Sequence, residues 1–100
     1  MADRRTFTYE EAAALLPEVQ RITDEAVAEV DELPESATDE AQSVVARWAE
    51  AILALGVEVK GLWLVDFDCG SGYYCWHYPE ASLQFFHGYE EGFGSRVPMV

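Results

Sequence analysis

The sequence predicts an α+β fold, in which an N-terminal antiparallel helical hairpin packs on a three-stranded antiparallel meander. Two observations support this prediction. Residues 1–56 hold thirteen of the nineteen acidic residues and only three aromatics, and their apolar side chains recur at helical spacing. Residues 57–100 hold ten aromatics, in runs that alternate and are separated by turn residues. A chain of 100 residues is expected to form a single domain, residues 1–100.

The first helix is predicted over about residues 9–32. Thr8 and Glu11 have the spacing of a capping box, in which each side chain accepts a hydrogen bond from the other residue's amide. Pro17 removes an amide donor inside this helix, so we expect a kink or a short break there. One apolar stripe runs along the helix: Leu15, Val19, Ile22, Ala26, Val30 and Leu33.

The second helix is predicted over about residues 38–55, after a turn at residues 33–37. It begins at Ser36 or Thr38, each of which is a good N-cap residue, and acidic side chains follow in its first turn. Gly56 is a typical C-terminal stop. Its buried face is predicted to contain Val44 or Val45, Trp48, Ile52 and Leu55.

The three strands are predicted over about residues 60–69, 72–78 and 83–88. Gly70-Ser71 suits a two-residue hairpin turn, and residues 79–82 form the second turn. One face of the sheet is expected to pack on the helices, with Trp63, Val65, Phe67, Tyr74, Trp76 and Tyr78. The other face then carries Leu62, Leu64, Asp66, Tyr73, Cys75 and His77.

The register of the third strand depends on the length of the second turn. The apolar pattern favours an even-numbered loop, which places His87 on the core face, away from Cys75 and His77. This register adds two residues to the core face, Leu83 and Phe85, and two to the other face, Gln84 and Phe86. A shift of one residue would reverse all of these positions.

The net charge of −13 excludes several classes of partner. It repels phosphate backbones and anionic lipid, and Lys60 is the only lysine of the chain, so we expect neither nucleic-acid nor membrane binding. The acidity fits a solvated surface, or adaptation to a high-salt environment. No apolar run has membrane-spanning length and no secretory signal is recognisable, so a cytoplasmic location with reduced cysteines is expected.

A metal site is one interpretation of the second sheet face. Cys75 and His77 lie two residues apart on one strand, and Asp66, opposite Cys75, is the best third ligand. Zinc requires three or four ligands, while Cys69 points the other way and His87 joins only in the alternative register. The other interpretation is that these are ordinary residues on a half-buried face, so no cofactor is predicted and zinc is the candidate if one is bound.

A thiol enzyme is a related interpretation, with Cys75 as nucleophile, His77 as base and Asp66 orienting it. Residues two apart on a strand are separated by roughly 6–7 Å, which is beyond hydrogen-bond reach for most rotamers. We therefore assign no catalytic residue.

The same face also suggests an interface. Two helices cover only one side of the sheet, and the other side would expose an apolar patch: Leu62, Leu64, Tyr73, Cys75 and Phe86. A second copy related by a two-fold axis would cover it, giving a homodimer. A small-molecule pocket between the subunits would then have His77, Asp66 and Gln84 as its polar lining.

The C-terminal segment, Gly88–Arg96, is rich in glycine but opens no helix and holds no lysine, so it is not a nucleotide site. We expect it to be anchored by Phe93, with Arg96 folded back to pair with Glu80 or Asp66.

Several short motifs together resemble the prokaryotic family known as domain of unknown function 2203. They begin with Phe7-Thr8, Glu11-Ala12 and Leu15-Leu16-Pro17, and continue with Val59-Lys60, Leu64-Val65-Asp66-Phe67, Cys75-Trp76, Glu80, His87, Gly92-Phe93 and Arg96. Asp68, Pro79 and Phe86 stand where that family usually has Pro, Gly and Trp. These departures affect local turn shape more than the fold.

The resemblance implies no activity, cofactor or partner. It directs attention to five polar residues, Asp66, Cys75, Glu80, His87 and Arg96. With His77 they form the candidate polar cluster. The sequence thus predicts a self-associating binding or structural module rather than an enzyme. The alternative is a metal-binding or thiol-based enzyme centred on Cys75, His77 and Asp66.

Overall fold

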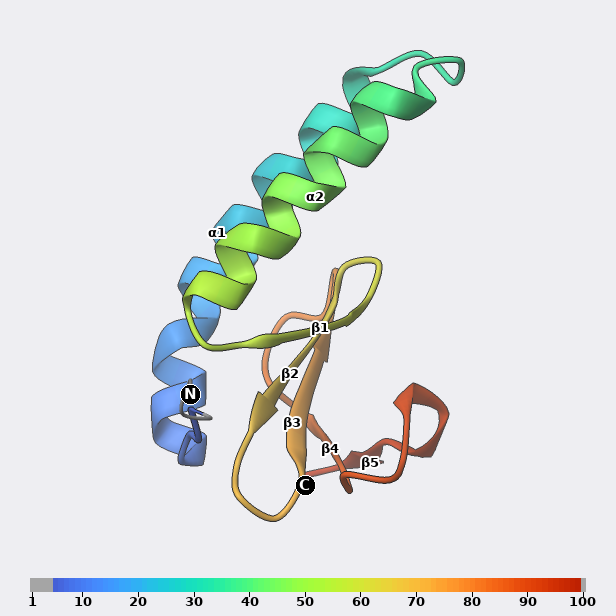
Figure 1. Cartoon of the computed structure of the whole chain (residues 1–100). Helices are drawn as coiled ribbons and strands as arrows, with labels where there is room; N and C mark the ends of the chain where they lie inside the picture. Colours follow the sequence, from blue (N-terminus) through green and yellow to red (C-terminus); the bar gives the residue numbers. More distant parts are fainter. Residues whose placement is uncertain (1–4, 100) are drawn as a thin grey trace, which may run out of the picture.

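The computed structural model of the chain describes residues 5–99 (Figure 1). It begins with the predicted antiparallel helical hairpin, α1 (Tyr9–Glu32) and α2 (Thr38–Ala54). Five strands follow: β1 (Glu58–Gly61), β2 (Leu64–Asp68), β3 (Tyr73–His77), β4 (Phe85–His87) and β5 (Val97–Pro98). A short 3-10 helix, η1 (Phe93–Ser95), precedes β5. Each strand pairs antiparallel with the next. The α+β class is confirmed, but the described sheet has five strands instead of three.

Local sequence signals explain the start of α1 and the end of α2, whereas the N-cap of α2 is Ala37, not Ser36 or Thr38, and makes no side-chain capping hydrogen bond. The Thr8 hydroxyl accepts a hydrogen bond from the Glu11 amide at 3.1 Å, and the Glu11 carboxylate accepts one from the Thr8 amide at 2.9 Å, so the capping box is confirmed. Helix α1 continues through Pro17 without a break. Gly56 adopts a φ of 82°, in the left-handed region that ends helices. Within residues 5–99, neither helix is long and apolar enough to cross a membrane.

The predicted first strand is wrong in one respect, because a turn divides it into β1 and β2. Trp63 adopts a φ of 58°, which an alternating apolar pattern does not reveal. Its indole stacks edge-on against Trp48 of α2, with ring centroids 4.9 Å apart. Its carbonyl accepts a hydrogen bond from the Tyr78 amide. Contacts distant in sequence therefore stabilise the turn.

The predicted register between β2 and β3 is confirmed. Phe67 pairs with Tyr74, and Asp66 pairs with Cys75, on either side of the turn at residues 70 and 71. The face predicted to pack on the helices does so, because Val65, Phe67 and Trp76 are all buried within the core. Trp63, Tyr74 and Tyr78 pack against this core as half-buried side chains.

The predicted register of the third strand is wrong by one residue. In β4, His87 pairs with Tyr73 and Phe85 with Cys75, so His87 lies on the same face as Cys75. Leu83 is buried as predicted, but it reaches the core from the loop, before the strand begins. Because Leu83 is not part of β4, its burial does not show which side chains of β4 point toward the core. Phe86 consequently lies beside Tyr74 on the helix side of the sheet, with ring centroids 6.3 Å apart.

The second sheet face is not exposed, contrary to the prediction. Tyr73 and Cys75 are only 6% and 0% accessible. The C-terminal part of the same chain covers this face. Tyr89 stacks edge-on against Tyr73, with centroids 5.1 Å apart, and Phe93 stacks against His77 at 5.3 Å. Leu62 does remain exposed, at 58%, but in the turn between β1 and β2. The face predicted as a subunit interface is thus the interior of a pocket.

Candidate functional site

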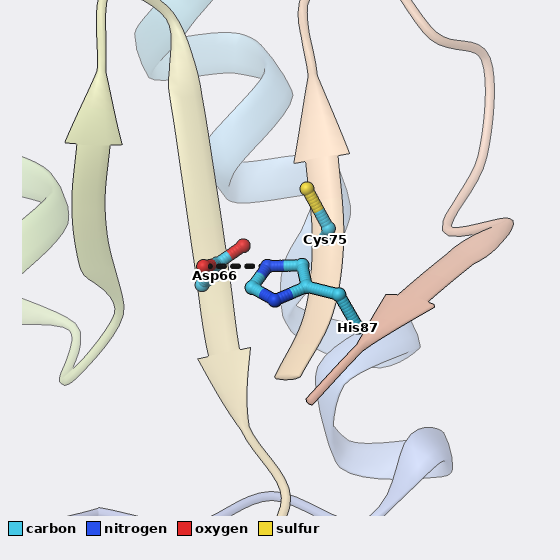
Figure 2. Close-up of side chains that lie close together, drawn as sticks. All are labelled: Asp66, Cys75 and His87. Atoms are coloured by element: carbon cyan, nitrogen blue, oxygen red, sulfur yellow. Dashed lines mark hydrogen bonds and ion pairs between the residues drawn. The ribbon is translucent and has the colours of Figure 1, made fainter. Parts of the chain in front are cut away.

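Three neighbouring strands each contribute one polar side chain to a buried cluster (Figure 2). Asp66 lies on β2, Cys75 on β3 and His87 on β4, and Figure 2 shows the three side chains gathered on one side of the sheet. One carboxylate oxygen, the thiol sulfur and one ring nitrogen all lie within 4.8 Å of one another. The three residues are 1%, 0% and 5% exposed. Antiparallel pairing brings them together. Asp66 lies opposite Cys75, and His87 lies opposite Tyr73, which is two residues before Cys75 and therefore on the same face of β3.

The hydrogen bonds of His87 define which of its nitrogens carries a proton. Nδ1 lies 2.9 Å from the Gly88 carbonyl oxygen, which can only accept, so Nδ1–H is the donor. Nε2 lies 2.9 Å from Oδ2 of Asp66. With Nδ1 protonated, a neutral ring presents a lone pair at Nε2, facing a carboxylate. The lone pair of Nε2 and the Asp66 carboxylate would repel each other unless a proton or a cation lies between them.

Asp66 has a second, unsatisfied oxygen. Its Oδ1 is buried and has no hydrogen-bond partner among the described residues. A buried carboxylate oxygen without a partner is costly, because the group loses its hydration without compensation. Such an atom, in a cluster with a thiol and an imidazole lone pair, is what a bound cation would satisfy.

The third side chain, Cys75, is held in its thiol form. Burial, and then the negative charge of Asp66, raise its pKa to about 12, and the nearby guanidinium of Arg96 offsets this only in part. The Arg96 Nη1 lies 3.9 Å from the sulfur. An activated nucleophile needs the opposite environment, one that lowers the pKa. His77 does not supply a base, since its ring packs against Phe93 instead.

The two cysteines are therefore expected to react differently with a thiol reagent. At neutral pH, Cys75 of chelator-treated protein should hold about 1,000-fold less thiolate than an ordinary cysteine. Its burial protects it further, whereas Cys69 is half-exposed. Peptide mapping after brief maleimide treatment should find the label on Cys69. Rapid labelling of Cys75 in the folded protein would contradict this and restore the thiol-enzyme interpretation, and Cys69→Ser serves as the control.

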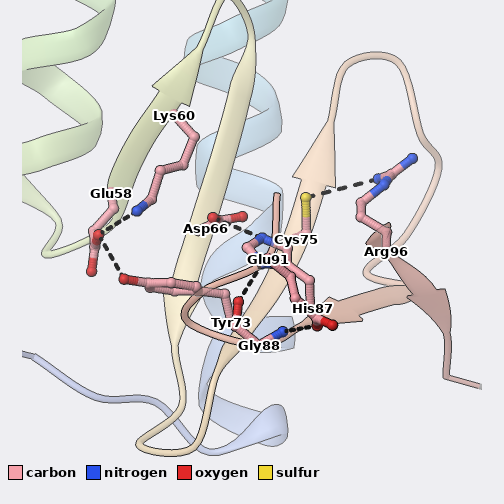
Figure 3. Close-up of polar contacts among 9 residues, drawn as sticks. All are labelled: Glu58, Lys60, Asp66, Tyr73, Cys75, His87, Gly88, Glu91 and Arg96. Atoms are coloured by element: carbon pink, nitrogen blue, oxygen red, sulfur yellow. Dashed lines mark hydrogen bonds and ion pairs between the residues drawn. The ribbon is translucent and has the colours of Figure 1, made fainter. Parts of the chain in front are cut away.

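The predicted return of the C-terminal segment is present, with Glu80 as the partner of Arg96. Arg96 Nη1 lies 2.8 Å from Glu80 Oε2, and the two side chains are only 12% and 20% exposed. The guanidinium also stacks between the rings of Phe85 and Phe93, 4.0 and 4.1 Å from their centroids. Figure 3 shows Arg96 reaching toward Cys75 from the C-terminal segment. This ion pair holds the segment over the second face of the sheet.

A pocket of about 270 Å³ lies next to the cluster, and all three donor residues line it. Sequence reasoning placed Leu64 and Tyr73 on this face but did not identify the rest of the lining: Lys60, Tyr89, Glu91, Gly92 and Phe93. Lys60 lies over the Tyr73 ring, and the Tyr73 hydroxyl donates to Glu58 (Figure 3). Only the folded C-terminal segment brings Glu91 and Phe93 to this place, so no local pattern could have revealed it.

Five of the six predicted site residues thus form two groups. Asp66, Cys75 and His87 come together as a candidate metal centre. Glu80 and Arg96 form the ion pair beside it. His77 lies on the same sheet face but belongs to neither group, since its ring contacts Phe93 and its amide donates to Glu80. The signal for His87 was its place among the family-like motifs, because the strand pattern pointed the other way.

Comparison with known protein families gives a match. A family described as "Uncharacterized conserved protein (DUF2203)" matches residues 32–99. This range starts at the last residue of α1 and contains the whole sheet and all three candidate donors. No curated protein and no solved structure matches the chain.

Proposed function

The chain belongs to the DUF2203 family of uncharacterised proteins, whose description names no activity, and we propose that it binds one zinc ion through Asp66, Cys75 and His87. The observation that carries the proposal is the Asp66–His87 contact. Nδ1 of His87 donates to a backbone carbonyl, which is the usual arrangement for a histidine whose Nε2 binds a metal. The unpartnered Oδ1 of Asp66 supports the same conclusion.

The donor set suits zinc. Thiolate, imidazole and carboxylate are its common ligands, at about 2.0–2.3 Å. Donors around a tetrahedral ion lie roughly 3–4 Å apart, which side-chain adjustments of about 1 Å reach from the present separations. The ion would displace the proton of the Cys75 thiol, and two negative ligands would balance its charge in this buried place. Three protein ligands leave a fourth position open, as in zinc sites that hold a water or a ligand.

The chain supplies its own controls for this proposal, because it contains two cysteines and two histidines. Protein purified without a chelator should carry one zinc per chain. Cys75→Ser and His87→Gln should each weaken zinc binding by more than the roughly 10–100-fold loss seen for residues that only orient a ligand. Cys69→Ser and His77→Gln should bind zinc like the parent protein. Metal analysis and native mass spectrometry measure all five proteins.

Two results would refute the proposal. One is retention of zinc in the Cys75 and His87 variants, and the other is a parent protein that stays free of zinc after exposure to a micromolar excess. Loss of zinc in His77→Gln but not in His87→Gln would instead support the ligand set predicted from the sequence. Circular dichroism of each variant shows that a loss of zinc is not a loss of fold.

Self-association and a cytoplasmic location remain predictions of the sequence. A homodimer cannot use the second sheet face as first expected, because Tyr73 and Cys75 are buried by the chain itself. The exposed apolar side chains Leu53 and Leu62 lie elsewhere, at 55% and 58% accessibility. The same native mass spectrum gives the number of subunits together with the bound metal.

A further inference from the structure

The pocket beside the three donors is small and has aromatic walls. At about 270 Å³ it is at the lower end of the range for small-molecule sites. Tyr73 and Tyr89 form one wall through their edge-on contact, and Phe93 and Leu64 also line the space. A flat apolar group of the size of a single aromatic ring fits such walls, because offset and edge-on ring contacts add to the gain from burial.

One cation, Lys60, lies among the residues that line this pocket. Its Nζ is 4.4 Å from the centre of the Tyr73 ring and 3.0 Å from Oε1 of Glu58. Partial burial by itself would lower the pKa of Lys60, but the hydrogen bond and charge of Glu58 outweigh it, so the pKa is raised. Lys60 is thus a protonated donor in a pocket whose lining also includes the three metal donors.

Charge determines what kind of ligand this combination accepts. Zinc with the Asp66 carboxylate and the Cys75 thiolate would be neutral, and Lys60, whose charge Glu58 already compensates, would donate a hydrogen bond to a bound monoanion. Glu91 also lines the pocket, with its carboxylate accepting from the Gly88 amide at 2.8 Å. Its negative charge opposes a second anionic group on the ligand. Phosphates and dicarboxylates are therefore disfavoured.

We infer that the pocket binds a small aromatic monocarboxylate, with one carboxylate oxygen on the metal ion, the other toward Lys60, and the ring between Tyr73, Tyr89 and Phe93. This inference rests on the proposed zinc site. It assigns Lys60 a role in ligand binding that metal binding itself does not require.

The test uses full-length protein loaded with cobalt(II), whose visible spectrum reports its ligands, and benzoate as the probe. Benzoate should change the cobalt spectrum at saturable concentrations, and benzyl alcohol, which lacks the charge, should not. Lys60→Met should bind cobalt with the same stoichiometry but benzoate about tenfold more weakly, as expected for loss of one charged hydrogen bond. Lys60→Arg should restore much of the affinity. Arg21→Met is the matched control, since it removes an exposed cation from α1.

The outcomes distinguish failure of the carboxylate site from failure of the proposed zinc site. Failure of the parent protein to bind cobalt or zinc overturns the metal site, and the inference with it. Cobalt binding without any response to benzoate overturns the inference and leaves the metal site standing. Equal benzoate affinity in the parent protein and in Lys60→Met also overturns it.

Discussion

Replacing His87 with leucine is expected to lower the free energy of unfolding of the metal-free protein by about 3 kcal/mol, the range for breaking a buried pair by removing one partner. The reason is the position of Asp66. Its side chain is 2% exposed, Oδ1 has no hydrogen-bond partner within the described chain, and Oδ2 lies 2.9 Å from His87 Nε2. The variant would leave a buried carboxyl group without its charge partner, with only the neutral Cys75 thiol as a neighbouring donor among the described residues.

A second substitution should reverse most of this loss. In Asp66→Val/His87→Leu no buried charge remains, and apolar replacement of a buried pair is often neutral or stabilising. We expect the double variant to unfold within about 1 kcal/mol of the parent protein, or above it. Urea unfolding with a chelator present measures all three. A double variant as unstable as His87→Leu alone would contradict this account.

The same variants show what the cluster contributes when metal is present. Zinc at 100 times its dissociation constant should stabilise the parent protein by about 2.7 kcal/mol. That gain corresponds to a rise of more than about 10 °C in Tm for a domain of this size. The double variant should gain nothing. These results together would show that the cluster stabilises the fold only when metal is bound.

The second large effect is expected in the core. Phe67→Ala should lower the free energy of unfolding by about 3–5 kcal/mol, because it removes a fully buried ring and leaves a cavity. Phe67 is 0% exposed and packs edge-on against Phe7, with centroids 5.4 Å apart. Since small domains are stable by only about 5–15 kcal/mol, we expect a large fall in Tm.

Leu62→Ala is the matched control for Phe67→Ala. Leu62 is 58% exposed, in the turn between β1 and β2, so its truncation should change stability by less than about 0.5 kcal/mol. Urea unfolding followed by tryptophan fluorescence compares the two variants. Similar losses for both would mean that Phe67 is not part of the folding core.

The position of the candidate metal centre has a structural consequence. Two of its donors, Asp66 and Cys75, come from strands that form the core on their opposite face, through Phe67 and Trp76. Anything that disturbs the packing on one face therefore moves the donors on the other. The Arg96–Glu80 pair closes the remaining side by holding the C-terminal segment in place.

The sequence by itself determined the elements whose signals are local. The capping box at Thr8, the stop at Gly56 and the two-residue turn at Gly70-Ser71 each act within a few residues, so both helices and the β2–β3 register were predictable. That register alone placed Asp66 opposite Cys75. Local signals are thus enough to predict that Asp66 and Cys75, two of the three donors, lie side by side.

The tertiary structure decided the rest, because the forces concerned act between distant segments. Trp63 turns away from the strand to meet Trp48 of α2, which divides the predicted first strand. Leu83 reaches the core from a loop, and the register of β4 differs by one residue from the predicted one. As a result His87, and not His77, joins Cys75 and Asp66 in the cluster. Arg96 pairs with Glu80, and the segment it anchors turns an expected outer surface into the lining of a pocket. Because side chains alternate along a strand, the sequence specifies which residues of that strand share a face. Only tertiary packing determines which of the two faces of the neighbouring strand lies on the same side of the sheet.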